Sequence, residues 1–434
     1  MASSLKKQVL GLVTEYNPFH NGHKYHLEQS KGLCSADYVV CVMSGNFIQR
    51  GEPAIVNKWA RAEMAVLAGA DLVLELPVVY AMASAEFFAY AAVKILDSIG
   101  ITNCICFGSE SGEIETLDKI AEILCKEPPL FRTLLKEQLD KGKSFPVSRQ
   151  SALLEYVARS GQIETAGDIG FILEQSNNIL GIEYLKALKK LGSKIKPYTI
   201  KRINNEYGTQ RITGGISSAT SIRKQLEVNS PALNGMDFAP TVAQTMPNSS
   251  CGILKREFGC GRGPVFPGSF GDILLAMVRK MSTGRIKALP YVSEGLENRI
   301  KDAADASGSF EEFIEKACTK RYPATRIQRI VFSILTGMDG AELENFNKFG
   351  GPQYARVLGF NDKGRHLLSL MKTSSLLPVI TKAANFKNSC NPLLRRMLQI
   401  ESATTDMYVL GYANPEFRKA GQEFTQSPVF AVER

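Results

Sequence analysis

Short apolar runs alternate with helix-forming segments along the first 230 residues of the chain. The apolar runs have the length of strands, and they cover residues 9–13, 38–43, 72–76, 101–107 and 195–200. Helix-forming sequence lies between or after them, at residues 23–33, 83–98, 114–139 with a break at two prolines, 151–160, 178–191 and 218–226. Strands that alternate with helices predict an α/β fold whose parallel sheet is wrapped by helices, and ligands bind such a sheet at the carboxyl ends of its strands.

The composition changes after about residue 230. Residues 235–269 contain six glycines and four prolines, which favours a connector with one short helix near residues 253–258. From Phe270 onward the sequence is helical, with few β-branched runs. We therefore predict a ligand-binding α/β domain over residues 1–235, a connector over 236–268 and a mainly α-helical domain over 269–434.

Several classes of protein are excluded by simple features of the chain. No apolar run approaches the ~18 residues that a membrane span needs, and no apolar segment typical of a signal peptide follows the first lysines. The nine cysteines are scattered and none forms a CxxC pair, which favours a reduced, cytoplasmic protein without a zinc ribbon or a disulfide framework. The net charge of +9 favours a polyanionic partner without identifying it.

Three of the four histidines, His20, His23 and His26, lie within seven residues. They follow the first predicted strand and open the first predicted helix, with Gly22 among them. A helix N-terminus offers unpaired N–H groups and a partial positive charge, and imidazoles three residues apart can donate to phosphoryl oxygens. The pattern favours a phosphate site; a metal site and a plain surface helix are the alternatives.

A second group of polar residues lies about 200 residues further on. Ser217, Ser218 and Thr220 open a predicted helix, and Arg223 follows one turn later. Hydroxyl and N–H groups at a helix start can hold phosphate oxygens, and an arginine can bind them in a bidentate manner. The alternative is an ordinary serine N-cap followed by a solvated arginine.

Together these two motifs resemble the HxGH and ISSTxIR motifs of the nucleotidylyltransferase superfamily, which is related to the class I aminoacyl-tRNA synthetases. Longer stretches, at residues 15–23, 43–53, 177–184, 217–223 and 320–327, make the chain similar, nearly end to end, to the bacterial tRNA(Met) cytidine acetate ligase family. Within the second motif the departure is Ala219, between Ser218 and Thr220. The resemblance implies a Rossmann-like nucleotidylyltransferase domain.

The resemblance also implies an activity. Members of the family use ATP and acetate to form acetyl-adenylate and pyrophosphate, and then transfer the acetyl group to N4 of the wobble cytidine of elongator tRNA(Met). Magnesium is expected with the triphosphate, held mainly by phosphate oxygens and water, so we predict no protein metal site. The positions that the resemblance assigns to ATP are Val13, Thr14, Glu15, Tyr16, Asn17, Pro18, Phe19, His20, Asn21, Gly22, His23, Lys24, Tyr25, His26, Gly108, Asn177 and Arg202.

We expect His20 and His23 to contact the α-phosphate, and Arg223, Ser218 and Thr220 to hold the β- and γ-phosphates. Simpler interpretations exist for the single positions. Gly108 suits an ordinary turn, Asn177 suits an N-cap, and Arg202 suits a solvated charge.

Basic residues concentrate in the second half, which we predict to bind tRNA. Lys320, Arg321, Arg326 and Arg329 form one group, with the last two on one helix face. Residues 351–400 contain eight basic residues, among them Arg356 and Arg396, and a single acidic residue, Asp362. Such a surface suits an RNA backbone, whereas a solvated helical face is the plain alternative.

Two other functions compete with the ligase. A nucleotidylyltransferase acting on a small phosphorylated metabolite would share the phosphate motifs but would not need the basic half. A non-enzymatic RNA-binding protein would not need intact phosphate motifs. The residues indicate neither the acetate pocket nor the oligomeric state.

Overall fold

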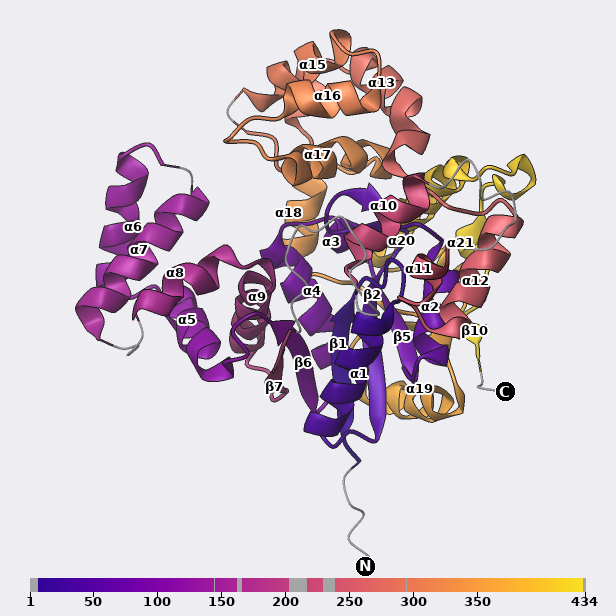
Figure 1. The fold of residues 1–434 in the computed structure, drawn as a ribbon, viewed down its shortest axis with the longest axis horizontal. Coiled ribbons are helices and arrows are strands. Elements are labelled where there is room, and N and C mark those ends of the chain that lie inside the picture. The colour runs from indigo at the N-terminus through magenta and orange to yellow at the C-terminus, as the bar shows by residue number, and fades with distance from the viewer. Residues whose placement is uncertain are drawn as a thin grey trace, which may run out of the picture.

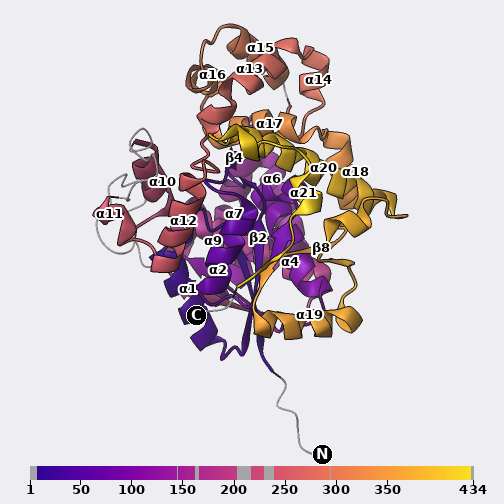
Figure 2. The same ribbon diagram turned by 90° about the vertical axis from the view of Figure 1, so that its right-hand side faces the viewer.

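An eight-stranded sheet forms the centre of the computed structural model, which describes residues 7–143, 145–161, 166–202, 217–228, 239–293 and 295–431. Five strands run parallel in the order β5-β2-β1-β6-β7, and helices lie on both faces (Figures 1 and 2). Their bounds are β1 Val9–Thr14, β2 Tyr38–Ser44, β5 Leu72–Leu76, β6 Cys104–Ser109 and β7 Lys196–Lys201. The five predicted strands and the α/β fold are therefore confirmed, with small shifts at the ends.

Alternate residues of each strand enter different cores, because successive side chains of a strand point to opposite faces. On β2, Tyr38, Val40 and Val42 belong to the core beneath helices α4 (Ala85–Ser98) and α9 (Ser176–Leu191). In contrast, Val39, Cys41 and Met43 belong to the core beneath α1 (Asn21–Leu33) and α2 (Lys58–Leu67). A sheet covered on both faces needs apolar residues at nearly every strand position. This explains why the runs in the sequence are continuous rather than alternating.

Every helix predicted in the first half is present, but three further helices, α2, α3 and α8, were not predicted. Their bounds are α1 Asn21–Leu33, α2 Lys58–Leu67, α3 Val78–Ala81, α4 Ala85–Ser98, α5 Ile114–Lys126, α6 Pro129–Asp140, α7 Phe145–Ser160, α8 Ala166–Glu174, α9 Ser176–Leu191 and α10 Ala219–Val228. The predicted break is present, with Pro128 as the N-cap of α6 and Pro129 in its first turn. A short hairpin of β3 Phe47–Ile48 and β4 Glu52–Pro53 follows β2.

The described part of the predicted connector packs against the sheet domain. It contains α11 Pro240–Ala243, α12 Asn248–Gly259 and the start of the 3₁₀ helix η2 Pro267–Phe270. Leu254 and Phe258 of α12 are buried in the same core as α2. The predicted short helix is present as the longer α12, which packs on the sheet domain; the division of the chain into domains stays a prediction, and its boundary at residue 235 lies outside the described residues.

The second half is mainly helical, but it also completes the sheet. Its helices are α13 Gly271–Lys280, α14 Thr283–Lys287, α15 Leu296–Asp305, α16 Phe310–Ala317, α17 Ala324–Thr336, α18 Gly340–Lys348, α19 Asp362–Ser374, α20 Pro392–Tyr408 and α21 Gln422–Thr425, with short 3₁₀ turns η3 Ala383–Phe386, η4 Val409–Gly411 and η5 Pro415–Phe417. Strand β8 (Ala355–Phe360) pairs antiparallel with β5, and β9 (Val379–Ile380) and β10 (Val429–Phe430) pair with β8. The mainly α-helical character of this half is therefore confirmed, while its three strands were not predicted.

A buried group of charges joins the two halves. Lys58 Nζ on α2 lies 2.6 Å from Glu75 on β5, 3.2 Å from Glu401 on α20 and 2.7 Å from Glu423 on α21. Arg356 on β8 pairs with Glu423 in the same buried region. Burial alone would lower the pKa of Lys58, but the three carboxylates outweigh it and raise that pKa above its ordinary value.

No helix among the residues described above is long and apolar enough to cross a membrane.

We predict that Lys58→Met lowers the free energy of unfolding by about 3–5 kcal/mol, because it leaves three buried carboxylates without their shared cation. Urea denaturation measures the change. Lys126→Met is the matched control: Lys126 forms an exposed pair with Glu122 on α5, and its loss changes stability by less than about 1 kcal/mol. Equal effects of the two substitutions would contradict a structural role for the buried group.

Candidate functional site

The candidate site lies where β1 and β6 part at their carboxyl ends. The ladder between these neighbours contains only Leu10 opposite Cys104 and Gly11 opposite Ile105, whereas β1 pairs with β2 along its whole length. The strand order also reverses at β1, which makes this crevice the switch point where open α/β sheets bind ligands.

His20 and His23 cap the start of α1 reciprocally. The Gly22 N–H donates to Nδ1 of His20 over 3.0 Å, and the His20 N–H donates to Nδ1 of His23 over 3.4 Å. The two imidazole rings stack with their centroids 3.7 Å apart. Since each Nδ1 accepts a hydrogen bond, the proton of each neutral ring is assigned to Nε2, a donor suited to a ligand oxygen.

Burial and two arginines keep the imidazoles neutral. Burial, Arg202 and Arg223 lower the pKa of His20 to about 3, and burial and Arg202 lower the pKa of His26 to about 4. Burial, the other two imidazoles and Arg202 lower the pKa of His23 well below its ordinary value. Positive charge at the site therefore comes from guanidinium groups, which stay protonated at every physiological pH.

Gly108, Asn177 and Arg202 lie together, as predicted from separate parts of the sequence. A Cβ at Gly108 would lie 3.2 Å from Cγ of Arg202 and 3.7 Å from Cδ2 of His26, so a glycine allows this close approach. Nη1 of Arg202 donates to Oδ1 of Asn177 over 3.2 Å, and Nδ2 of Asn177 donates to Oε1 of Glu110 over 2.6 Å. Asn177 thus orients the arginine, and Gln175 is the N-cap of α9 instead.

Arg223, on α10, also contacts the loop after β1. Its Nη1 donates to the carbonyl oxygen of Asn17 over 2.9 Å, and its Nη2 donates to Oε1 of Glu52 over 2.9 Å. The amide of Asn17 is itself fixed, because its Oδ1 accepts the Ile55 N–H over 2.7 Å. The interpretation of Arg223 as a merely solvated arginine is therefore wrong.

The hydroxyl groups of the second motif lie at the start of α10. Ser218 Oγ accepts the Ser221 N–H over 3.1 Å, which is the geometry of an N-cap, and Thr220 is exposed in the first turn. The first residues of this motif, Gly215 and Ile216, lie outside the described residues. The structure leaves the phosphate contacts of Ser218 and Thr220 as predictions.

Other predicted residues take supporting places. Tyr16 and Phe19 are buried and pack their rings edge-on with centroids 4.6 Å apart, and Tyr16 packs the same way against His23 at 5.0 Å. Lys24 is exposed and pairs with Glu28, so the structure does not bring Lys24 to the histidines.

Sequence reasoning missed Arg61 on the buried helix α2. Its guanidinium donates to the carbonyl oxygens of Glu15 at 2.5 Å, Ser44 at 3.0 Å and Val56 at 3.2 Å, and also to that of Gly45. Burial lowers the pKa of Arg61 to about 10, so the group stays charged at neutral pH. The sequence did contain a signal for this residue, because Arg61 is a charged residue among the apolar residues of the segment that forms α2.

Glu52 and Glu110 were also not assigned to the site. Each binds a predicted site residue, Arg223 and Asn177 respectively. Glu110 directly follows β6 at the carboxyl edge of the sheet, and this position was the signal that could have found it.

The predicted RNA-binding group divides into two kinds of residue. Lys320 and Arg321 are exposed. Arg326 instead donates to the carbonyl oxygen of Tyr291 over 2.9 Å, and the Nε of Arg329 is buried without a hydrogen bond to the described residues. Arg326 therefore also supports the fold, whereas the Nε of Arg329 does not.

The turn around Gly51 brings the helical half against the site. Gly51 has a φ of +71°, and a Cβ there would lie 2.3 Å from the amide nitrogen of Arg329 on α17. The next residue, Glu52, binds Arg223. The hairpin thus contacts both halves of the protein.

The basic count of residues 351–400 overstates the charge available to RNA. Arg356 is 2% exposed and pairs with Glu423, and Arg396 donates to Oε1 of Glu342 over 2.6 Å. Both positive charges are paired with carboxylates of the protein. The prediction that this stretch forms a basic surface is therefore wrong for Arg356 and Arg396.

We predict that stability falls as the pH is lowered below about 6.5. The unfolded chain protonates its histidines near 6.5, whereas His20 and His26 resist protonation down to about 3 and about 4 in the folded protein. Between these values the unfolded state binds more protons, so acid favours unfolding. Urea titrations at pH 7 and pH 5 measure the loss, and His26→Gln reduces it. Imidazole NMR signals of these residues with midpoints above pH 6 would contradict the prediction.

Comparison with known proteins agrees with this geometry. Residues 7–423 match the family model described as HIGH Nucleotidyl Transferase. A tRNA(Met) cytidine acetate ligase from Acetivibrio thermocellus is 56% identical over 420 residues, 97% of this chain and 99% of the relative. One from Caldanaerobacter subterraneus is 46% identical over 94% of this chain and 96% of the relative.

Solved structures show the same fold. A crystal structure of Thermotoga maritima TmcAL bound with alpha-thio ATP has a TM-score of 0.89 at 39% sequence identity, and the similarity covers 98% of this chain and 99% of that one. The apo form of the same protein gives a TM-score of 0.92, with the same coverage. By its sequence and its fold, this chain belongs to the HIGH nucleotidyl transferases and, among them, to the tRNA(Met) cytidine acetate ligase family.

Proposed function

We propose that this protein uses ATP to activate acetate as acetyl-adenylate and transfers the acetyl group to N4 of the wobble cytidine of elongator tRNA(Met). The observation that carries the proposal is the convergence of His20, His23, Arg202 and Arg223 on the crevice between β1 and β6. The names of the relatives support the choice of tRNA and acetate, and the bound ATP analogue in the Thermotoga maritima structure supports ATP.

The first step forms the adenylate. A carboxylate oxygen of acetate attacks the α-phosphorus, the bond from that phosphorus to the bridging oxygen breaks, and pyrophosphate leaves with the electron pair. Neutral His20 and His23 donate N–H groups to the α-phosphate oxygens as negative charge develops there. We assign the leaving pyrophosphate to Arg223, Ser218 and Thr220.

Arg223 is oriented before any ligand binds. Its two hydrogen bonds, to the Asn17 carbonyl and to Glu52, direct the guanidinium plane towards the loop after β1. A group held in this way loses little conformational entropy when a phosphate binds. Glu52 thus positions the arginine, although it also places one negative charge near the triphosphate.

The second step is the transfer to RNA. The N4 amine attacks the acetyl carbonyl carbon, the bond from that carbon to the adenylate oxygen breaks, AMP leaves and the amine loses a proton. The cytidine has to be unpaired and turned outward to reach the adenylate. We assign this presentation of the base to the helical half.

Magnesium enters this proposal with ATP. Among the described residues, no three His, Cys, Asp or Glu side chains are grouped to hold a metal ion. We expect a Mg²⁺ ion to be held by phosphate oxygens and water, where it would offset the charge of the triphosphate.

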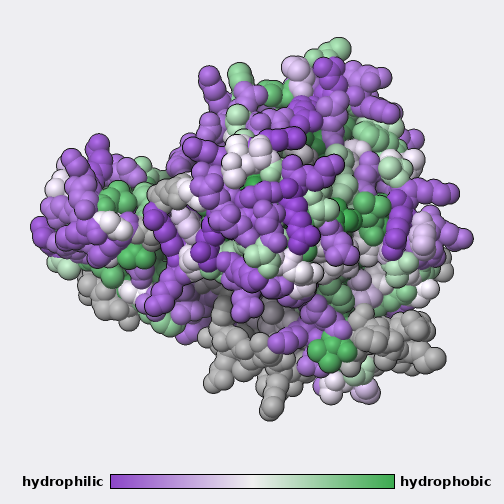
Figure 3. All heavy atoms as spheres, turned by 90° about the horizontal axis from the view of Figure 1, so that it is seen from above, coloured by the Kyte–Doolittle hydropathy of each residue, from purple (hydrophilic) through white to green (hydrophobic). Residues whose placement is uncertain are grey.

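We propose that tRNA contacts the helical half around Lys320 and Arg321. Both side chains are exposed. Figure 3 looks down on α13–α17, and hydrophilic residues cover most of the face turned to the viewer. An exposed polar surface with lysines and arginines suits a phosphate backbone, which is bound through charge rather than through apolar contact.

A single incubation tests the proposed function. The protein is mixed with ATP, labelled acetate and total tRNA, and label in the tRNA is measured. Label in elongator tRNA(Met) that disappears without ATP supports the ligase. Pyrophosphate release that needs a phosphorylated metabolite instead of acetate would establish the metabolite enzyme, and RNA binding without turnover would establish a non-enzymatic protein.

We predict that His23→Ala lowers acetate-dependent pyrophosphate release by about 100-fold or more, because it removes one oriented donor to the α-phosphate. Pyrophosphate is measured without tRNA, so that only the first step is observed. Gln29→Ala, on the exposed face of the same helix, is the control and leaves the rate unchanged. Near-normal turnover of the His23 variant would remove this residue from the mechanism.

We predict different defects for two basic residues of the helical half. Lys320→Ala weakens tRNA binding and reduces the slope of its salt dependence by about 1, because one phosphate contact is lost. Arg326→Ala instead lowers stability by about 1 kcal/mol, because it removes a hydrogen bond to the Tyr291 carbonyl. Binding titrations at two salt concentrations and thermal denaturation separate the two effects. An unchanged salt slope for the Lys320 variant would exclude that lysine from the RNA surface.

A further inference from the structure

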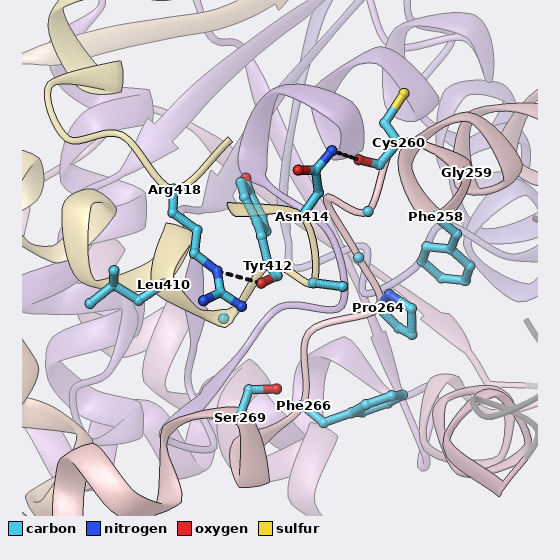
Figure 4. Close-up of a pocket in the computed structure, with 14 residues that line it drawn as sticks. Phe258, Gly259, Cys260, Pro264, Phe266, Ser269, Leu410, Tyr412, Asn414 and Arg418 are labelled. Atoms are coloured by element: carbon cyan, nitrogen blue, oxygen red, sulfur yellow. Dashed lines mark hydrogen bonds between the residues drawn. The ribbon is translucent and has the colours of Figure 1, made fainter. Parts of the chain in front are cut away.

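A cavity of about 760 Å³ lies outside the candidate site. Two segments form its walls, residues 258–269 at the end of α12 and residues 410–418 after α20. Figure 4 shows the guanidinium group of Arg418 and the hydroxyl group of Ser269 on one side of the open space, with Pro264 and the ring of Phe266 on the other. None of the residues that we assign to ATP lines this cavity.

The two walls are joined to each other by hydrogen bonds. The Asn414 N–H donates to the Gly261 carbonyl oxygen over 3.1 Å, and Nδ2 of Asn414 donates to the Cys260 carbonyl oxygen over 3.3 Å. The ring of Phe417 packs against the guanidinium of Arg262 at 4.9 Å. The cavity is therefore preformed, which reduces the entropy lost when a ligand binds.

Arg418 gives the cavity an oriented anion-binding group. Its Nε donates to the Tyr412 carbonyl oxygen over 2.7 Å, while its two Nη groups make no hydrogen bond or ion pair with the described residues. The side chain is exposed at the rim. A guanidinium held by Nε and open at both Nη atoms matches two oxygens of a phosphate.

The opposite wall suits a flat aromatic group. Phe258, Pro264 and Phe266 supply apolar surface against which a flat ring can stack. The volume also falls within the usual range of small-ligand pockets. A phosphate site beside apolar surface suited to a flat ring matches the two main parts of a nucleotide.

The cavity is also close to the reaction centre along the hydrogen-bond network. The N–H of Val265, which lies between the lining residues Pro264 and Phe266, donates to the Ile55 carbonyl oxygen over 2.9 Å. The Ile55 N–H in turn donates to Oδ1 of Asn17, in the loop after β1, over 2.7 Å. Ile55 thus links the segment that lines the cavity to the loop that we assign to ATP.

We propose that this cavity binds one unpaired nucleotide of the RNA substrate, with its phosphate on Arg418 and its base against Phe266 and Pro264. The proposal rests on the proposed function, because it takes RNA as the substrate. Base stacking on aromatic and apolar side chains is the usual way in which proteins hold unpaired nucleotides. The site would help to keep the anticodon loop of the RNA open while the cytidine reacts.

The substitution Arg418→Ala tests the phosphate contact. We expect the KM for tRNA to rise by about 10-fold, while acetate-dependent pyrophosphate release without tRNA stays normal. Lys419→Ala removes a neighbouring exposed charge that does not line the cavity, and it is expected to change the KM by less than about 3-fold. An Arg418 variant with a normal KM for tRNA would overturn the proposal.

A second variant tests whether Arg418 is needed for the fold rather than for RNA binding. Arg418→Lys keeps the charge but loses both the paired Nη donors and the Nε bond to Tyr412, so we expect a KM between those of the wild type and the alanine variant. Loss of pyrophosphate release together with a lower melting temperature in both variants would show that Arg418 supports the fold, and this result would also overturn the proposal.

Cys260 provides an independent probe, because this half-buried residue lies at the edge of the cavity, although Figure 4 shows its thiol turned away from the open space. Alkylation by iodoacetamide is followed by mass spectrometry, with Cys125 on α5 as the internal reference. We expect tRNA to slow alkylation of Cys260 by about 5-fold relative to Cys125, as expected for an occupied site, and ATP alone to have no effect. Unchanged alkylation at saturating tRNA would contradict occupation of the cavity.

The two proposals can fail separately. Wild-type protein that protects Cys260 with tRNA but transfers no acetate would refute the proposed function and keep the nucleotide site. Wild-type protein that acetylates tRNA without protecting Cys260 would refute the nucleotide site and keep the function.

Discussion

The architecture depends on the buried ion group around Lys58. One ammonium ion on α2 meets carboxylates from β5, α20 and α21, residues up to 365 positions away in the chain. Charges in an apolar interior are tolerated only when they are paired and hydrogen-bonded. The C-terminal helices therefore cannot separate from the sheet without exposing unpaired charge, and the two halves of the chain fold as one body around α2.

The same helix supports the reaction centre. Arg61 lies one turn after Lys58 and donates to backbone carbonyls at the ends of β1 and β2. These are the strands whose carboxyl ends carry the histidine loop and the hairpin with Glu52. A single buried helix thus joins the frame of the protein to the loops that we assign to ATP.

Burial decides the charge state of the histidines in the site. Burial keeps the imidazoles neutral, so they act as hydrogen-bond donors, while Arg202 and Arg223 supply the positive charge. Arginine does not lose its proton at physiological pH, so this division keeps the charge of an anion site constant. The arrangement suits the binding of a triphosphate and of the pyrophosphate that leaves it.

The local features of this protein could be predicted from the sequence, because they depend on neighbouring residues. The apolar runs indicated five strands of a parallel sheet, and the segment with the histidines and Gly22 indicated a helix that begins after β1. Strand β8 was missed because its burial depends on β5, nearly 300 residues earlier, and Arg326 was assigned to a surface although it bonds to Tyr291. Tertiary structure alone decided which charges are buried and paired, because the partners of Lys58, Arg61 and Arg356 are distant in the chain and only the folded backbone brings them together.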